Sequence, residues 1–195
     1  MPIRALSNGS SINYFHFVDG GGTFAVMKKL IISIGMMCAL AIAVHGQDAT
    51  KATCKLESKS GSKVTGTVTF TKVGDDVEVV ADITGLTPGK HGFHIHEKGD
   101  CSAADASSAG AHFNPTAHKH GGPATTDRHE GDLGNIEADA SGKAHLDWKG
   151  KMSLSGPDSI IGKSVVVHEK EDDLKTDPSG NSGARQACGA IEAAK

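Results

Sequence analysis

Apolar and polar residues alternate with a period of two in several short segments of the chain, and turn residues separate these segments. In residues 63–70, for example, Val64, Val68 and Phe70 fall on one side of an extended chain, and threonines fall on the other. Such alternation predicts a β-strand with one buried face. The same pattern predicts strands at residues 52–57, 77–83, 92–96, 144–148 and 164–168.

Glycine, proline, serine and aspartate mark the turns between these segments, and no segment beyond residue 46 has the periodicity of an amphipathic helix. Short strands at this spacing predict an all-β sandwich or barrel. Two regions, residues 97–137 and residues 169–188, lack the alternation, and we expect them to be long loops. Loops of this length are usually functional or disordered, so we expect a metal ion and a disulfide to order them.

The N-terminal region carries the features of a secretory signal. Residues 30–44 form an uncharged, mostly apolar run that directly follows Lys28 and Lys29. The run is shorter than the roughly 18 residues that a membrane span needs, and it has the length of the apolar part of a signal peptide. We therefore expect a signal peptide at residues 27–46.

The boundaries of the mature chain follow from this signal. We expect cleavage after Gly46, with Ala43 as the alternative site. Residues 1–26 precede a suitable start at Met27, and they are either an over-extended start or a disordered leader. The functional domain is accordingly expected at residues 47–195.

The charge balance excludes one class of function. The chain has 20 basic and 23 acidic residues, and removal of the predicted leader and signal changes the formal net charge from −3 to −5. A nucleic-acid-binding domain carries an excess of basic residues, so we expect no nucleic-acid partner. We also expect no membrane attachment of the mature form.

Three cysteines remain in the predicted mature chain. In a secreted protein, an odd number of cysteines suggests one disulfide and one spare thiol. Cys54 lies in the alternating segment 52–57, where a buried strand thiol is the natural interpretation. This leaves Cys101, in the first long loop, to pair with Cys188 at the end of the second.

Histidines cluster in the predicted strand ends and in the first long loop. His94 and His96 are two residues apart in one strand, so both imidazoles face the same side. His168 ends another strand. Nitrogen-rich sites suit copper and zinc, and three histidines with one carboxylate suit tetrahedral zinc. More ligands are present than one ion needs, so we expect two ions; the other candidates are His112, His120, His129 and Asp132.

Six motifs, in order, resemble those of the copper/zinc superoxide dismutase family, and the resemblance covers residues 49–195. It implies an eight-stranded Greek-key β-sandwich or barrel with two long functional loops. It also implies an enzyme that converts superoxide to dioxygen and hydrogen peroxide. The motifs lie at residues 92–97, 112–115, 120–123, 131–135, 166–169 and 183–189.

The resemblance also implies the metal ligands, because each candidate histidine falls at a matching position. His112 belongs to both sets, since a deprotonated imidazole offers a nitrogen to each of two cations. His118 is a rival to His120, which we prefer because it lies in the matching string Lys-His-Gly-Gly-Pro. The implied copper ligands are His94, His96, His112 and His168, and the implied zinc ligands are His112, His120, His129 and Asp132.

The remaining implied roles concern the substrate and the residues that support the metal ligands. Copper would cycle between Cu(II) and Cu(I), whereas zinc would be structural and would tune the bridging His112, which supplies a proton. Arg185 would attract and orient superoxide. Asp172 would accept hydrogen bonds from ligand imidazoles on both metals and so fix their orientation.

Several expectations concern assembly, location and rival functions. The loop before Arg185 is shorter than in animal members of the family and lacks their cluster of Glu and Lys, so steering of the substrate is left open. Residues 160–162 and 188–191 resemble dimer-forming segments, and we expect a homodimer. We expect a secreted protein, either periplasmic or extracellular. The alternative function is a secreted protein that stores copper and zinc without turnover.

Overall fold

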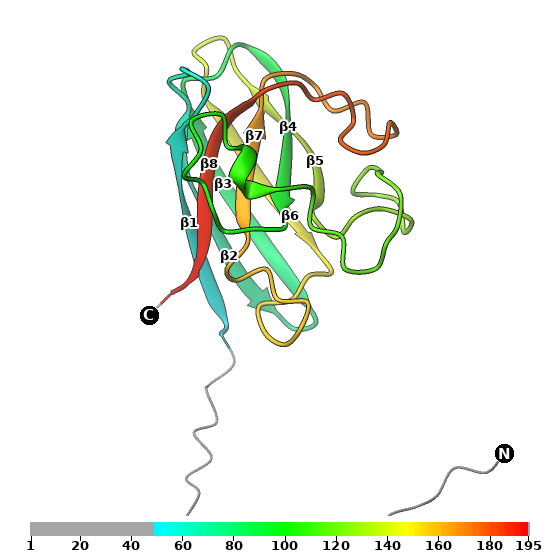
Figure 1. Ribbon diagram of the computed structural model, residues 1–195. Helices are drawn as coiled ribbons and strands as arrows, with labels where there is room; N and C mark the ends of the chain where they lie inside the picture. Colours follow the sequence, from blue (N-terminus) through cyan, green and yellow to red (C-terminus); the bar gives the residue numbers. More distant parts are fainter. Residues whose placement is uncertain (1–48, 195) are drawn as a thin grey trace, which may run out of the picture. The chain divides into compact units, whose positions relative to one another are not determined.

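The computed structural model describes residues 49–194, and these residues form eight antiparallel strands that close into a barrel (Figure 1). A single 3₁₀ turn, η1 (Ser107–Ala109), lies in the long loop after the fourth strand. The strands are β1 (Lys51–Ser58), β2 (Thr65–Val73), β3 (Asp76–Thr84), β4 (Gly89–His96), β5 (Asp132–Ala138), β6 (Ala144–Gly150), β7 (Ser164–His168) and β8 (Arg185–Ala193).

The strands follow one another around the barrel in the order β1-β2-β3-β6-β5-β4-β7-β8. Because β3 pairs with β6 while β4 lies between β5 and β7, the connection from β3 to β4 crosses one end of the barrel. This arrangement confirms the prediction of an all-β, eight-stranded fold. Within residues 49–194, no helix is long and apolar enough to cross a membrane.

Both predicted long loops are shorter than the sequence indicates. The first ends at residue 131 rather than 137 because β5 begins at Asp132, and the second ends at residue 184 because β8 begins at Arg185. Asp, Gly and Asn in β5, and Ala and Gly in β8, are poor strand formers, so propensity does not reveal these strands. Barrel closure forms them instead, since each pairs with strands on both sides.

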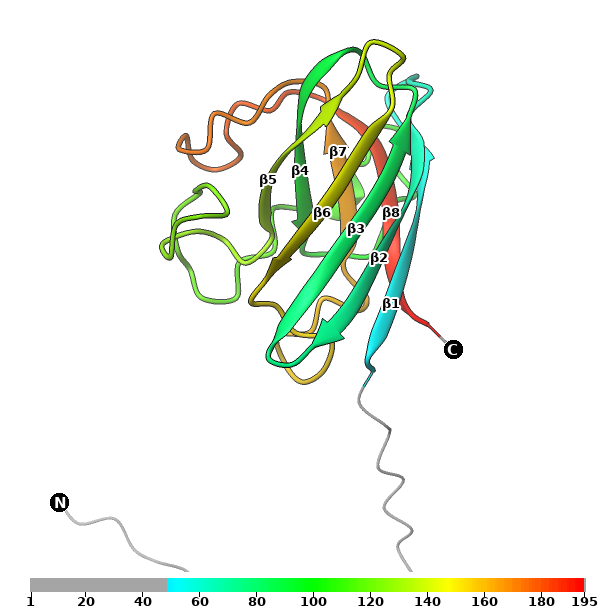
Figure 2. The same cartoon turned by 180° about the vertical axis from the view of Figure 1, so that it is seen from behind.

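The alternation seen in the sequence places one face of each strand in the barrel core. Leu56, Phe70 and Phe93 are among the largest fully buried side chains, and Cys54 is a buried free thiol in β1. Cys101 and Cys188 form the predicted disulfide, which joins the first long loop to β8. In both views, residues 115–130 and 170–182 project on the same side of the barrel, beside β4 and β5 (Figures 1 and 2).

The predictions for the leader at residues 1–26 and the signal peptide at residues 27–46 lie outside the described residues.

Candidate metal centre

The strand β4 supplies the first two histidines of the centre. Phe93 and Ile95 point into the barrel core, so His94 and His96 point to the opposite side, as the alternation predicts. Both histidines are nevertheless buried, and residues of the two long loops contact them: Asp172 contacts His94, and Gly110 contacts His96. His168 ends the neighbouring strand β7 and joins the same group.

Two further residues reach the centre through pairing with β4. His112 forms an isolated antiparallel bridge with His96, although it lies sixteen positions further along the chain. Asp132 is the first residue of β5 and pairs with His94. Close approach of backbones allows this, since a Cβ on Gly131 would collide with the carbonyl oxygen of Ile95. Pairing with β4 therefore places His112 and Asp132 close to His96 and His94.

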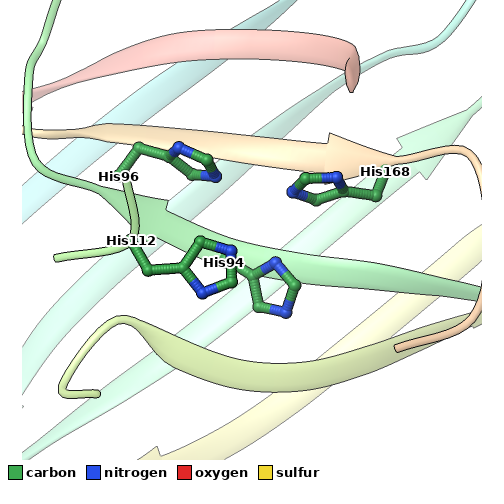
Figure 3. A group of neighbouring side chains, drawn as sticks. All are labelled: His94, His96, His112 and His168. Atoms are coloured by element: carbon green, nitrogen blue, oxygen red, sulfur yellow. The ribbon is translucent and has the colours of Figure 1, made fainter. Parts of the chain in front are cut away.

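The first group contains four buried imidazoles that converge from β4, β7 and the first loop (Figure 3). One nitrogen from each ring lies within 4.8 Å of the others. Within residues 49–194 these nitrogens have no hydrogen-bond partner. Buried polar atoms are normally paired, so a group of four unpaired nitrogens fits a soft, nitrogen-preferring cation such as copper. The four are Nδ1 of His94 and Nε2 of His96, His112 and His168.

In two of these rings, those of His96 and His168, the other ring nitrogen lies near a backbone carbonyl oxygen. Nδ1 of His96 donates to the carbonyl oxygen of Gly110 at 2.9 Å, and Nδ1 of His168 lies 3.3 Å from that of Gly183. An N–H committed to a carbonyl leaves the other nitrogen with its lone pair. These hydrogen bonds assign the tautomers and aim Nε2 at the shared centre.

The second group is centred on the buried carboxylate of Asp132. Its Oδ1 lies 2.8 Å from Nδ1 of His112 and 3.2 Å from Nδ1 of His129, and its Oδ2 lies 3.0 Å from Nδ1 of His120. The last pair lacks hydrogen-bond geometry, so Nδ1 of His120 also has no hydrogen-bond partner in the described part of the chain. Three imidazoles and one carboxylate are a suitable donor set for tetrahedral zinc.

Asp172 links the two groups. One carboxylate oxygen accepts from Nε2 of His94 at 2.8 Å, and the other accepts from Nε2 of His120 at 2.9 Å. The side chain of Asn135 holds the backbone of Asp172: its Oδ1 accepts from the Asp172 amide at 2.8 Å, and its Nδ2 donates to the Asp172 carbonyl oxygen at 2.9 Å. The sequence contained Asn135 in a family motif, but nothing in its residue type indicated this role. Gly180 is also needed here, because a Cβ at this position would collide with the Asp172 carboxylate.

Burial and neighbouring carboxylates have opposite effects on the pKa values of the histidines: burial lowers them, and the carboxylates raise them. Burial lowers the pKa of His94, His96 and His168, and it lowers the pKa of His112 to about 4 despite the nearby Asp132 carboxylate. Neutral imidazoles are the form that binds a metal. At His120, burial also opposes a charge, but the two carboxylates that contact its ring, Asp132 and Asp172, outweigh it and raise the pKa to about 10.

The carboxylates show the matching effect. Burial acts to raise the pKa values of Asp132 and Asp172, yet hydrogen bonds from the histidines bring both below their ordinary range. The second group is therefore a buried place that stabilises positive charge, whether a proton on His120 or a divalent ion.

Arg185 begins β8 and pairs with His168 in the β7–β8 ladder. Its guanidinium donates to the carbonyl oxygens of Ala106 and Gly110, each at 2.7 Å. Both carbonyls belong to the loop segment that the disulfide of Cys101 anchors to β8. The side chain is half-buried beside the first histidine group, where its charge contributes to the lowered pKa of His96 and His168.

The other histidines among the described residues lie outside the two groups and have polar partners of their own. His118, the rival zinc candidate, is partly exposed and lies 2.7 Å from Asp127, so it is not part of either group. His145 makes a similar exposed pair with Asp82. His91 is buried with both ring nitrogens near carbonyl oxygens, which belong to Thr87 and His168.

Comparison with known proteins agrees with this geometry. A family model described as copper/zinc superoxide dismutase (SODC) matches residues 64–191, which is more than half of the chain. The chain belongs to the copper/zinc superoxide dismutase family. This confirms the family predicted from the six motifs, and copper and zinc are the metals of that family.

Two curated relatives show the extent of the similarity. The chain is 46% identical over 140 residues to an extracellular superoxide dismutase [Cu-Zn] of Caenorhabditis elegans, covering 68% of this chain and 63% of the relative. It is 47% identical over 146 residues to the protein of the same name from Brugia pahangi, covering 70% of this chain and 72% of the relative. The chain therefore spans less than two thirds of the first of these relatives.

A solved structure shares the superoxide dismutase fold seen here. The crystal structure of the clock protein EA4 superimposes with a TM-score of 0.70 at 43% sequence identity. The match covers 76% of this chain and 97% of that chain.

Proposed function

We propose that this chain is a secreted superoxide dismutase, which converts two superoxide anions and two protons into dioxygen and hydrogen peroxide. The observation that carries the proposal is the pair of buried donor groups that share His112. Copper held by His94, His96, His112 and His168 would supply one-electron chemistry, while zinc held by His112, His120, His129 and Asp132 keeps one oxidation state.

Arg185 serves as the anion-binding residue in this proposal. Two of its five N–H donors bind the carbonyls of Ala106 and Gly110, which fixes the guanidinium beside the copper ligands. The remaining donors are left to bind a small anion and to orient it toward the copper group. Because its charge is permanent, Arg185 attracts superoxide even though the mature chain is acidic overall.

His112 serves as the proton carrier. Its two ring nitrogens face the two donor groups, and its ring is buried and fixed by Asp132 on one side. Burial disfavours a charged ring, so a proton taken up at Nε2 is readily passed on to the peroxide product. Asp172 orients His94 and His120 and so keeps both donor groups in register with His112.

The alternative function is a secreted store of copper and zinc without turnover. A store needs the same histidines, but it has no use for a cation fixed beside the copper group. Arg185 therefore favours the enzyme.

The proposed mature chain begins at residue 47, after a leader at residues 1–26 and a signal peptide at residues 27–46. N-terminal sequencing of the secreted protein tests this boundary. A start at residue 44 would favour the alternative site after Ala43, and a retained segment would contradict secretion by this route.

The proposed mature chain forms a homodimer. Residues 160–162 and 188–191 lie together, because Gly162 and Ile191 are joined by a backbone hydrogen bond of 2.9 Å. Ile161 is only partly buried beside this contact. Light scattering of the wild type and of Ile161→Glu tests the interface. A dimer that becomes monomeric supports the proposal, and a monomeric wild type contradicts it.

The decisive experiment measures superoxide decay with the secreted chain loaded with copper and zinc. Fast decay that requires copper and stops on chelation is expected. Tight copper binding with decay no faster than the background in solution would instead identify a metal store.

A further inference from the structure

Arg128 directly precedes His129 in the chain, and its side chain is bound to the backbone of the turn that follows. Nη1 of Arg128 donates to the carbonyl oxygens of His129 at 2.7 Å, Glu130 at 3.1 Å and Asp132 at 3.2 Å. The turn is closed by a hydrogen bond of 3.1 Å from the Asp132 amide to the His129 carbonyl. Three carbonyls of one tight turn therefore converge on a single cationic nitrogen.

Trp148 of β6 lies beside the guanidinium of Arg128. The guanidinium carbon lies 5.9 Å from the centroid of the indole ring, within the range of a cation–π interaction. Trp148 packs against the barrel core and is the single tryptophan of the sequence. Gly150 gives the ring its space, because a Cβ there would collide with the end of the indole. The barrel wall thus provides a fixed support for Arg128.

We propose that Arg128 is a positioning residue for the zinc ligands His129 and Asp132, and that Trp148 holds the Arg128 side chain in place. The hydrogen bonds from Arg128 to the three carbonyl oxygens fix the peptide planes between His129 and Asp132. The orientation of these planes determines where the imidazole and the carboxylate point. Ligands must be held within about 0.5 Å of their working geometry, and outer partners of metal ligands affect affinity by about 10–100-fold. The inference rests on the proposed zinc ligands.

The hydrogen bonds and the positive charge of Arg128 have opposite effects on zinc. The charge alone would repel a divalent ion. The carbonyl oxygens that receive the N–H group carry partial negative charge and offset this repulsion, and the guanidinium spreads its charge over three nitrogens. We therefore expect positioning to outweigh repulsion, so that removal of Arg128 weakens zinc binding rather than strengthening it.

The test measures Zn²⁺ binding to the metal-free mature protein in competition with a chelator. We expect Arg128→Met to weaken binding by about 10–100-fold, Arg128→Lys to restore part of the loss, and Trp148→Leu to weaken binding less than Arg128→Met. Trp148→Phe retains a ring and should bind nearly as the wild type does. Lys149→Met is the matched control, because it removes an exposed charge from the same strand and should leave binding unchanged.

A second readout separates positioning from general stability. Co²⁺ replaces zinc in such sites and its visible spectrum reports the coordination geometry, so Arg128→Met should change that spectrum. A merely structural role would lower the melting temperature of the metal-free protein and leave the spectrum and the Zn²⁺ affinity of the folded protein unchanged. If Arg128→Met does not fold, Arg128→Lys and Trp148→Leu decide the question by the same two measurements.

The outcomes distinguish this inference from the proposed function. If the wild type takes up no Zn²⁺, or if His120→Ala leaves uptake unchanged, the proposed zinc ligands are wrong. If the wild type binds Zn²⁺ through His120 but the Arg128 variants bind it equally tightly or more tightly, with an unchanged Co²⁺ spectrum, Arg128 is not a positioning residue.

Discussion

Arg185 and His96 donate to the same acceptor, the carbonyl oxygen of Gly110, at 2.7 and 2.9 Å. The shared oxygen fixes the distance between a permanently charged group and a proposed copper ligand. It also assigns the N–H of His96 to Nδ1, which leaves Nε2 for the metal. One turn of the first long loop therefore holds both the anion-binding Arg185 and the proposed copper ligand His96.

Substitution Arg185→Ala should slow superoxide decay by at least about tenfold at low ionic strength, because the cation that attracts the anion is lost. Copper and zinc content should remain that of the wild type. Pulsed or stopped-flow decay of superoxide over a range of salt concentrations measures the effect. The salt dependence should become weaker in the variant, and an unchanged rate would favour the metal store.

Substitution Asp172→Asn should weaken the binding of both metals by about 10–100-fold. An amide oxygen can accept from His94 or from His120, but the amide nitrogen then faces the N–H of the other ring. Chelator competition gives the affinities. Glu171→Gln is the matched control, since it removes the neighbouring exposed charge and its contact with Lys90; equal losses in both variants would show that charge alone matters.

Replacement of both disulfide cysteines by serine should lower the free energy of unfolding by about 2–5 kcal/mol. The bond joins residues 87 positions apart and anchors the segment that carries Ala106 and Gly110. We therefore expect the variant to lose activity at denaturant concentrations where its β-barrel is still folded. Denaturant titrations followed by activity and by circular dichroism test this, and coincident curves would argue against a local role.

Burial raises the pKa of the Cys54 thiol from 9.0 to about 12, so the native protein should react very slowly with iodoacetamide at pH 8–10. The unfolded chain loses this proton near its ordinary pKa while the folded chain keeps it. The stability linked to Cys54 is thus fully present below pH 9 and is lost as the pH rises toward 12. Urea titrations of the wild type and Cys54→Ala across that range measure the effect, and identical pH dependence in both would contradict it.

The sequence predicted the parts of the centre that residue type and strand periodicity encode. His94 and His96 follow from alternation in β4, and the family motifs pointed to His112, His120 and Asp172, which the fold brings together. The strand that begins at Asp132 was missed, because its residues are poor strand formers and only pairing with β4 and β6 creates it.

The partners that hold the site could not be predicted in the same way. Arg185 binds the backbone carbonyls of Ala106 and Gly110, and any residue type can offer a carbonyl. The same holds for Arg128, whose acceptors are also backbone oxygens. Such contacts depend on the path of a loop, and neither periodicity nor composition specifies that path.

The closure of the barrel has a consequence for the connectivity of the chain. Its first and last strands, β1 and β8, are hydrogen-bonded neighbours, and the amide of Ala194 donates to the carbonyl of Lys51 at 2.9 Å. A short linker between these ends, with new termini opened in the exposed turn at Gly74, would give a circular permutant. The order of the strands along the polypeptide is then separable from their order around the barrel.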